Sequence, residues 1–334
     1  MTSNDTSSPT PTTPPSAIRS AAVHMLARWM GERFYRTFRP EADDEHPSSP
    51  FDAVLQQRDR RVGVSVGVLW DEVVEIPGVA QFSELLTADA SVDPGVLAGS
   101  YAVWVPPKAT IPTEEPAASN LRVVLFNGLK HLDVGERREV RVPVTVKLAK
   151  LQAEGAYVSV TGGLSPLWLA MSEGIPGAFH LDSRPVHRLP EEAAEIEILV
   201  TRVRDRAMVL EPGELTDIPV HDYWAVSRLP DGSPPGVTIV AAPPEVDPVD
   251  GAAIRRQFRR EVQRAVEQKQ AGDTDLAVLV VVGAFAHIKD ELVTSSLRGM
   301  NPALYGTLDM VVLVADGAVR QVLQPRSLPW EEAR

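Results

Sequence analysis

Asp52 is the acidic residue best placed for chemistry in this chain. It opens the segment FDAVLQQRDRRVGVSVGVLWDE (51–72), which we predict to form two short strands joined by a charged turn. In the second strand, valines at every other position predict one buried face, while glycines and a serine occupy the other. Carboxylate oxygens are preferred ligands of Mg²⁺. An active site here would combine Asp52 with a further acid, chosen from Glu32, Asp71 and Glu72.

A predicted helix over residues 250–271 carries the second candidate site. Its apolar residues recur at helical spacing, which predicts one buried side. The opposite side is rich in guanidinium groups that could bind phosphates: Arg255, Arg256, Arg259, Arg260 and Arg264. Charge runs more often form solvated faces that pair with acids elsewhere, and the sequence leaves both interpretations open.

Several common kinds of site are excluded by the sequence. The chain has no cysteine, which excludes disulfides, thiolate zinc sites, iron–sulfur clusters and a cysteine nucleophile. Its histidines form no HxxxH or HExxH motif, and no Walker-type or GxGxxG loop occurs. We therefore expect no metal site and no cofactor, except Mg²⁺ if the Asp52 site is active. Scattered residues that could assemble a site, but are more typical of loop caps and surfaces, are His180, Asp182, His187, His221 and Asp222.

The elements that position these residues follow from periodicity and from turn residues. We predict helices over residues 17–38, 79–87, 120–132, 191–207, 250–271 and 289–297. We predict strands over residues 61–69, 99–105, 140–148, 157–160, 237–241, 276–282, 308–315 and 319–323, with strand 157–160 as the partner of strand 140–148. Residues 211–236 have no assignable pattern, because proline and glycine interrupt them.

The segment LAVLVVV (276–282) is apolar on both faces, which is typical of a strand covered by helices on both sides. The alternation of strands and helices in this part of the chain indicates a parallel α/β layer. We therefore predict that strands 276–282 and 308–315 are buried neighbours in one sheet, and that strand 61–69 joins the same sheet.

Together, the helix before the hairpin, the hairpin, and the late helix with its buried strand resemble the restriction-endonuclease-like (PD-(D/E)xK) fold over about residues 17–72 and 250–315. Such enzymes hold Mg²⁺ with an aspartate at the start of one strand and an acid on the next, and a lysine two residues later assists the water. The resemblance places the second acid at Ser65 and the lysine at Gly67. Serine is a poor Mg²⁺ ligand and glycine has no charge, so the resemblance implies an inactive site.

The fold class expected is therefore α/β, with a mixed sheet flanked by helices and a strand-rich middle insertion. The corresponding division is a disordered Ser/Thr/Pro-rich tail (1–16), the first half of the core (17–135), the insertion (136–235) and the second half of the core (236–325).

Composition limits the functional classes. The chain has 334 residues, a formal net charge of −12 and a pI near 5.1, which argues against a protein that coats nucleic acid by bulk attraction. No apolar run is long enough for a membrane span, and residues 1–16 lack the features of a secretory signal, so we expect a cytoplasmic protein without a membrane partner.

Three functions remain as hypotheses. The first is a catalytically inactive nuclease-fold protein that binds nucleic acid or a partner protein. The second is an active Mg²⁺-dependent nuclease whose acids have migrated, with Asp52 acting beside Glu32, Asp71 or Glu72. The third is a protein-interaction scaffold without a role in nucleic-acid binding.

Overall fold

The computed structural model describes residues 15–41, 49–70, 78, 79, 82, 86, 99–284, 287 and 301–331. Three sequence predictions lie outside these residues: the tail up to residue 14, the acids Asp71 and Glu72, and the helix at 289–297. Of the predicted helix at 79–87, only Val79, Phe82 and Leu86 are described.

The first sheet has the strand order β1-β2-β3-β10-β11-β12. Strands β2 and β3 form an antiparallel hairpin, β3 and β11 lie parallel to β10 on its two sides, and β12 returns antiparallel to β11. The prediction that three buried segments share this sheet is confirmed. The bounds are β1 (Arg39–Pro40), β2 (Ala53–Gln57), β3 (Arg60–Val68), β10 (Leu276–Gly283), β11 (Met310–Ala315) and β12 (Ala318–Leu323).

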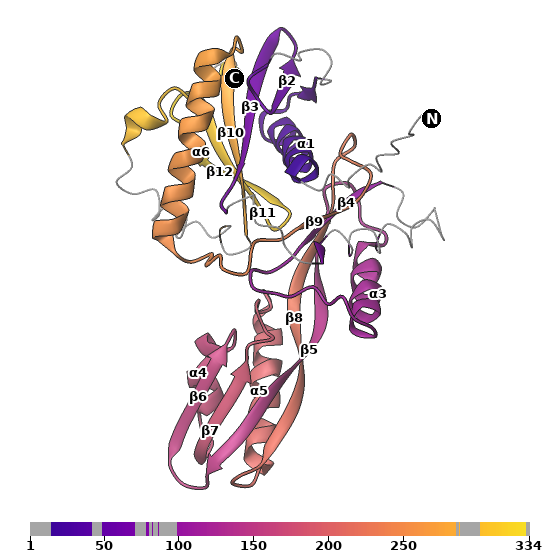
Figure 1. Cartoon of the computed structure of the whole chain (residues 1–334), viewed down its shortest axis with the longest axis vertical. Helices are drawn as coiled ribbons and strands as arrows, with labels where there is room; N and C mark the ends of the chain where they lie inside the picture. Colours follow the sequence, from indigo (N-terminus) through magenta and orange to yellow (C-terminus); the bar gives the residue numbers. More distant parts are fainter. Residues whose placement is uncertain are drawn as a thin grey trace, which may run out of the picture.

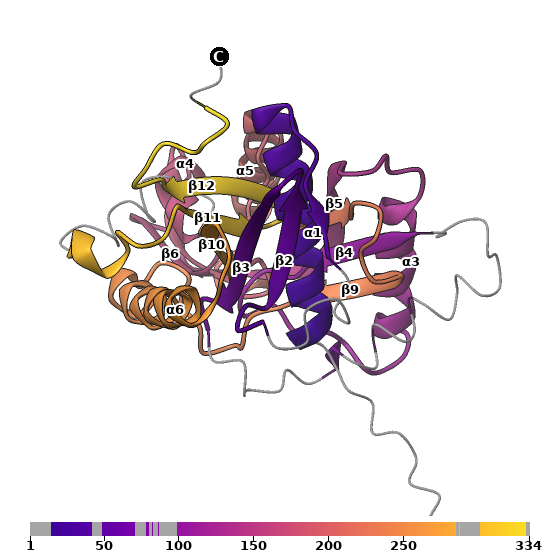
Figure 2. The same cartoon turned by 90° about the horizontal axis from the view of Figure 1, so that it is seen from above.

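Helices α1 (Pro15–Phe34) and α6 (Gly251–Ala271) lie on opposite sides of this sheet (Figures 1 and 2). Every residue of β10 is buried between them, as its two-sided apolar character predicts. The glycine and serine face of β3 meets α6 closely, and Gly63 of that face accommodates the ring of Phe51.

The second sheet has the strand order β6-β7-β5-β8-β4-β9. Its long central strands, β5 and β8, pair from Arg137 opposite Ser227 to Ala149 opposite Leu215. They run from the side of the first sheet to the far end of the molecule (Figure 1). The bounds are β4 (Ser100–Trp104), β5 (Arg137–Gln152), β6 (Ala156–Gly162), β7 (Gly177–Ser183), β8 (Leu215–Arg228) and β9 (Gly236–Val240).

The two ends of this second sheet are covered by different helices. Helix α3 (Ala117–Leu129) packs on the end nearer the first sheet, beside β4 and β9. Helices α4 (Trp168–Ser172) and α5 (Ala193–Val209) pack on the far end, where α4 contacts β6 and α5 contacts β8. We call residues 144–222, which contain that far end, the outer lobe. The protein is thus a mixed α/β structure with two mixed sheets flanked by helices.

Two features of the second sheet differ from the sequence predictions. Strand 157–160 was expected to pair with strand 140–148, but β7 lies between them and β6 runs parallel to β7. The short connection suggested a hairpin, whereas the return through α4 allows β7 to enter the sheet beside β5. Residues 211–236, which had no predicted element, contain β8, a 14-residue strand that includes Pro219.

Strands 99–105 and 237–241 were expected in the two halves of the core, and they pair with each other in the second sheet. In the part of the chain that is described, no helix has both the length and the apolar character needed to cross a bilayer.

Candidate functional site

The Asp52 carboxylate is held by groups from three elements. Its Oδ2 accepts a hydrogen bond from the backbone N–H of Val66 at 2.7 Å, which ties the residue to β3. Arg19 of α1 donates to Oδ1 at 3.1 Å, and Nη1 of Arg264 of α6 lies 3.3 Å from Oδ2. Arg264 also donates to the carbonyl of Val66. Two guanidinium groups therefore occupy the space around the Asp52 carboxylate.

Glu261 is a second acid beside this site, and sequence reasoning missed it. Its side chain is buried on α6, 3.2 Å from Nε of Arg264 and 3.4 Å from Nε of Arg260. A Cβ atom added to Gly67 would collide with its carboxylate. Glu261 lies on the apolar side of α6, among Phe258, Val262 and Ala265. An acid inside an apolar helical stripe is the signal that could have identified it.

Ser65 stands where the resemblance places the second acid. It is buried, and its Oγ has no hydrogen-bond partner among the described residues. A hydroxyl is a weaker Mg²⁺ ligand than a carboxylate. Ser65 therefore does not supply the negative charge that a second carboxylate would bring to this position.

The residues around Asp52 do not fit a divalent cation. Both carboxylates face Arg264, so a cation there would meet a guanidinium group rather than a second free oxygen ligand. Across the described residues, no group of three His, Cys, Asp or Glu side chains is arranged to hold a metal ion. Arg264 neutralises the carboxylates of Asp52 and Glu261, and these residues do not support a metal-dependent step.

The other predicted catalytic acids do not reach Asp52 in the described structure. Glu32 is an exposed residue of α1 and pairs with Arg28 at 2.8 Å. It lies 13 residues after Arg19 on the same helix, roughly 20 Å along its axis. Glu72 lies outside the described residues.

The predicted arginine strip on α6 divides into parts with different surroundings. Arg264 turns inward to Asp52, and Arg255 is half-buried on the opposite margin of the helix. Nine residues at 3.6 residues per turn place these two about 180° apart. Three arginines remain on the solvent side, and among the described residues only one of them has an ion pair, the contact of Arg260 with Glu261. These exposed arginines are Arg256, Arg259 and Arg260.

The scattered histidines and aspartates do not assemble one site. His187 and Asp222 do meet, with Nδ1 3.1 Å from the carboxylate. Asp222 is buried and also accepts hydrogen bonds from the backbone N–H of Arg188 and from the indole of Trp224, so it acts as a structural acceptor. Asp182 pairs with Arg184, whose hydrogen bond lowers the pKa of the Asp182 carboxyl to about 2.

A second buried carboxylate, Asp316, joins the two sheets and was also not predicted. It lies in the turn between β11 and β12 and contacts Arg188 at 2.6 Å and Arg137 at 2.5 Å. Arg137 is the first residue of β5, and Arg188 follows the end of β7, so both come from the part of the chain that forms the second sheet. Glu191 accepts from the same two arginines, and the hydrogen bond from Arg137 lowers the pKa of its carboxyl.

We compared the chain with protein-family models, with curated proteins and with solved structures, and none of them matches it.

Proposed function

We propose that this protein is a non-catalytic nucleic-acid-binding protein built on a restriction-endonuclease-like core. The order of helix, hairpin, late helix and buried parallel strand supports the fold assignment. The observation that carries the functional proposal is the closed Asp52 site. Its carboxylate is neutralised by Arg19 and Arg264, and the acid and lysine of an active nuclease are replaced by Ser65 and Gly67.

The absence of cleavage is tested directly. Purified protein incubated with duplex DNA and Mg²⁺ should leave the DNA intact, because Arg264 occupies the position where a cation would bind. Cleavage that is lost in Asp52→Ala would show that an active site has been rebuilt with other acids, and it would establish the migrated-acid nuclease instead.

The exposed arginines of α6 supply the proposed binding surface. Arg256, Arg259 and Arg260 are exposed along little more than one turn of one helix, a spacing that can reach neighbouring phosphates. The apolar side of α6 anchors the helix through residues buried in the first core, Ile254, Phe258, Val262 and Ala265. Charge reversal on the outer side should therefore leave the fold intact.

The binding experiment is fluorescence anisotropy with labelled DNA and RNA at several salt concentrations. Each phosphate contact on duplex DNA should contribute about −0.9 to the log–log salt slope. Joint substitution of Arg256, Arg259 and Arg260 by Glu should abolish binding and leave the melting temperature nearly unchanged. A matched control makes the same charge change on the outer lobe, with Lys147, Arg184 and Arg204 substituted by Glu.

Two outcomes contradict this proposal. If the parent protein shows no salt-dependent binding, its function does not involve nucleic acid. If the triple variant on α6 is strongly destabilised while the outer-lobe control is not, the arginines serve the fold and not a ligand.

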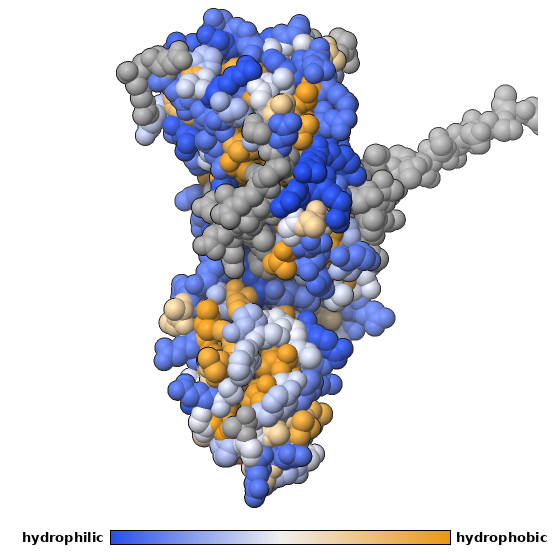
Figure 3. Space-filling model, turned by 90° about the vertical axis from the view of Figure 1, so that its left-hand side faces the viewer, coloured by the Kyte–Doolittle hydropathy of each residue, from blue (hydrophilic) through white to orange (hydrophobic). Residues whose placement is uncertain are grey.

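The outer lobe supports a second candidate function, a protein-interaction scaffold. Eight of the twelve large apolar side chains that are exposed in the described residues lie in this lobe. They include Trp168, Leu169 and Val209, and Figure 3 shows apolar patches over the same end of the molecule. Such a concentration is typical of surfaces that associate with other proteins.

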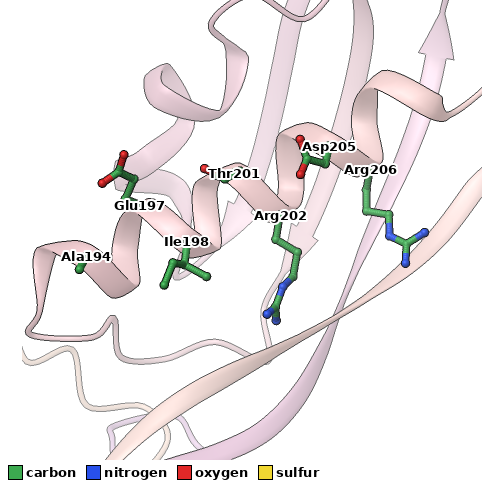
Figure 4. Close-up of a pocket in the computed structure, with 7 residues that line it drawn as sticks. All are labelled: Ala194, Glu197, Ile198, Thr201, Arg202, Asp205 and Arg206. Atoms are coloured by element: carbon green, nitrogen blue, oxygen red, sulfur yellow. The ribbon is translucent and has the colours of Figure 1, made fainter.

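Helix α5 indicates which partner fits this lobe. Its outer side bounds a shallow cavity of about 590 Å³. Glu197 and Asp205 point to one side of the helix, and Arg202 and Arg206 point to the other (Figure 4). Two copies of α5 packed parallel, about a two-fold axis that runs along the helices, would place each acidic row against the basic row of its partner. We therefore propose a second copy of the chain as the partner.

Sedimentation velocity tests this association. Reversing the acidic row, with Glu197→Arg and Asp205→Arg, should give monomers, as should reversing the basic row with Arg202→Glu and Arg206→Glu. An equimolar mixture of the two variants should restore the dimer, because the reversed rows are again complementary. A parent protein that is monomeric at all concentrations would exclude this scaffold.

A further inference from the structure

A basic cavity lies at the other end of β2 from Asp52. Its volume is about 440 Å³, which is within the usual range for small-ligand sites. It is bounded by the end of α1, by β1 and by the turn of the hairpin, roughly 15 Å along the strand from Asp52. The residues that line it are Tyr35, Arg36, Thr37, Arg39, Gln56, Gln57 and Arg58.

The charge of this cavity is one-sided. Its lining contains three arginines and no carboxylate, in a chain whose net charge is −12. None of these arginines forms an ion pair with an acid of the described residues, whereas Arg19, Arg61 and Arg137 elsewhere do. Neighbouring guanidinium groups repel one another, so an anion bound between them would stabilise all three.

Two residues of the lining adopt a backbone conformation that favours glycine. Tyr35 has a φ of 55° and Arg58 a φ of 56°. Arg58 is the first of the two turn residues between β2 and β3, where glycine is preferred when φ is positive. Side chains kept in such strained positions are concentrated at functional sites. Here, both side chains line the same cavity.

Gln57 adds a polar group to the lining. The residue is only 6% exposed, and it lines the cavity together with Arg58. A side-chain amide both donates and accepts hydrogen bonds. It can therefore bind a polar group of a ligand that a guanidinium group, which only donates, cannot bind.

We propose that this cavity binds a nucleotide. The three guanidinium groups of Arg36, Arg39 and Arg58 would bind its phosphates by charge-assisted hydrogen bonds. The exposed ring of Tyr35 would stack on the base, and the amide of Gln57 would hydrogen-bond to a polar group of the sugar or base. This site is separate from the arginines of α6, and it extends the function beyond the binding surface proposed above.

The test is isothermal titration of the full chain at low salt with ATP, ADP, AMP and adenosine. Affinity should fall in that order, because each phosphate removed eliminates contacts with arginine, and adenosine should not bind. The double variant Arg39→Glu, Arg58→Glu should weaken ATP binding by about tenfold or more. The matched control, Arg256→Glu with Arg259→Glu on α6, carries the same charge change and should bind ATP as the parent does.

A second pair of measurements separates base stacking from simple anion binding. Tyr35→Ala should weaken ATP binding and leave the binding of inorganic tripolyphosphate unchanged. Gln57→Leu should weaken ATP binding and retain the melting temperature of the parent. If Tyr35→Ala has no effect on ATP, the nucleotide assignment is overturned and only an anion site remains.

The phosphate could belong to a free nucleotide or to the 5′ end of a nucleic-acid strand. Two oligonucleotides distinguish these sources, one with a 5′-phosphate and one with a 5′-hydroxyl. The strand end is the source if the 5′-phosphorylated form binds more tightly than both ATP and the 5′-hydroxyl form. That binding should also depend on Arg39 and Arg58. Absence of binding for ATP and for both oligonucleotides would overturn the proposal. The proposal would also be overturned if the α6 control variant lost ATP affinity to the same extent as the Arg39 and Arg58 variant, because that result would place the site on α6.

Discussion

Asp52 and Asp316 each bind two arginines, but their surroundings differ. The side chain of Asp52 is 13% exposed, and its partners Arg19 and Arg264 are each about one-third exposed. The side chain of Asp316 is 3% exposed, and that of Arg188 is 6% exposed. Water can therefore replace the partners of Asp52 more easily than those of Asp316.

The two clusters also connect different parts of the molecule. Asp52 joins α1 and α6 to the edge of a single sheet. Asp316 belongs to the first sheet, and its arginines come from the segments of the second. The comparison indicates that one arrangement neutralises a partly exposed carboxylate within the layers of the first sheet, and that the other fastens two sheets together. Four experiments can strengthen or refute this distinction.

The largest effect is expected for Asp316→Asn. Asparagine tolerates the positive φ of 53° at this position, so the substitution removes the charge and leaves the turn intact. Arg188, which is 6% exposed, would lose its partner at 2.6 Å and keep the exposed Glu191 and the more distant Glu139. The free energy of unfolding should therefore fall by about 3 kcal/mol. Urea unfolding measures it. The control Asp182→Asn, which breaks an exposed pair with Arg184, should cost at most about 1 kcal/mol.

Asp52→Asn should have a smaller effect, about 1–2 kcal/mol, because Arg19 and Arg264 can be hydrated once the charge is lost. The same urea experiment applies. A loss equal to that of Asp316→Asn would mean that the Asp52 cluster is itself a main support of the fold.

Gly67→Ala tests how closely Glu261 of α6 packs against β3. The added methyl group would collide with the Glu261 carboxylate, so the free energy of unfolding should fall by about 1 kcal/mol. The cost should decrease in a Glu261→Ala background, where the methyl group has room. A double-mutant cycle measures this coupling, and a coupling energy of zero would contradict the packing described here.

The smallest effect concerns pH. The hydrogen bond from Arg137 lowers the pKa of the Glu191 carboxyl below its ordinary value of 4.5. The unfolded chain therefore binds this proton first as the pH falls, so the stability that Glu191 contributes is complete above about pH 4.5 and is lost below it. Because Glu191 is largely exposed, this loss of unfolding free energy at low pH is small. The substitution Glu191→Gln should reduce it by well under about 1 kcal/mol. Thermal melts between pH 7 and pH 3.5 measure the difference, and identical pH profiles would show that the pair contributes nothing.

Local patterns in the sequence predict the elements of the first sheet well. Alternating valines place β3, and an unbroken apolar run places β10 between two helices. The second sheet is predicted less well, since prolines and glycines obscure β8 and the position of β7 depends on a crossover. The Asp52 site is predicted in part, because the sequence analysis identifies Asp52 but does not single out Glu261.

The order of residues alone predicts which segments are buried, because burial of a strand or helix face leaves a period of two or about 3.6 residues in the order of apolar residues. It also shows that Ser65 and Gly67 carry neither a carboxylate nor an amine. Which charges neutralise each other depends on the tertiary fold. Asp316 is separated from its arginines by 179 and 128 residues, and Arg264 from Asp52 by 212. Ion pairs of that separation leave no period in the sequence, because they depend on where the folded chain brings the two side chains together.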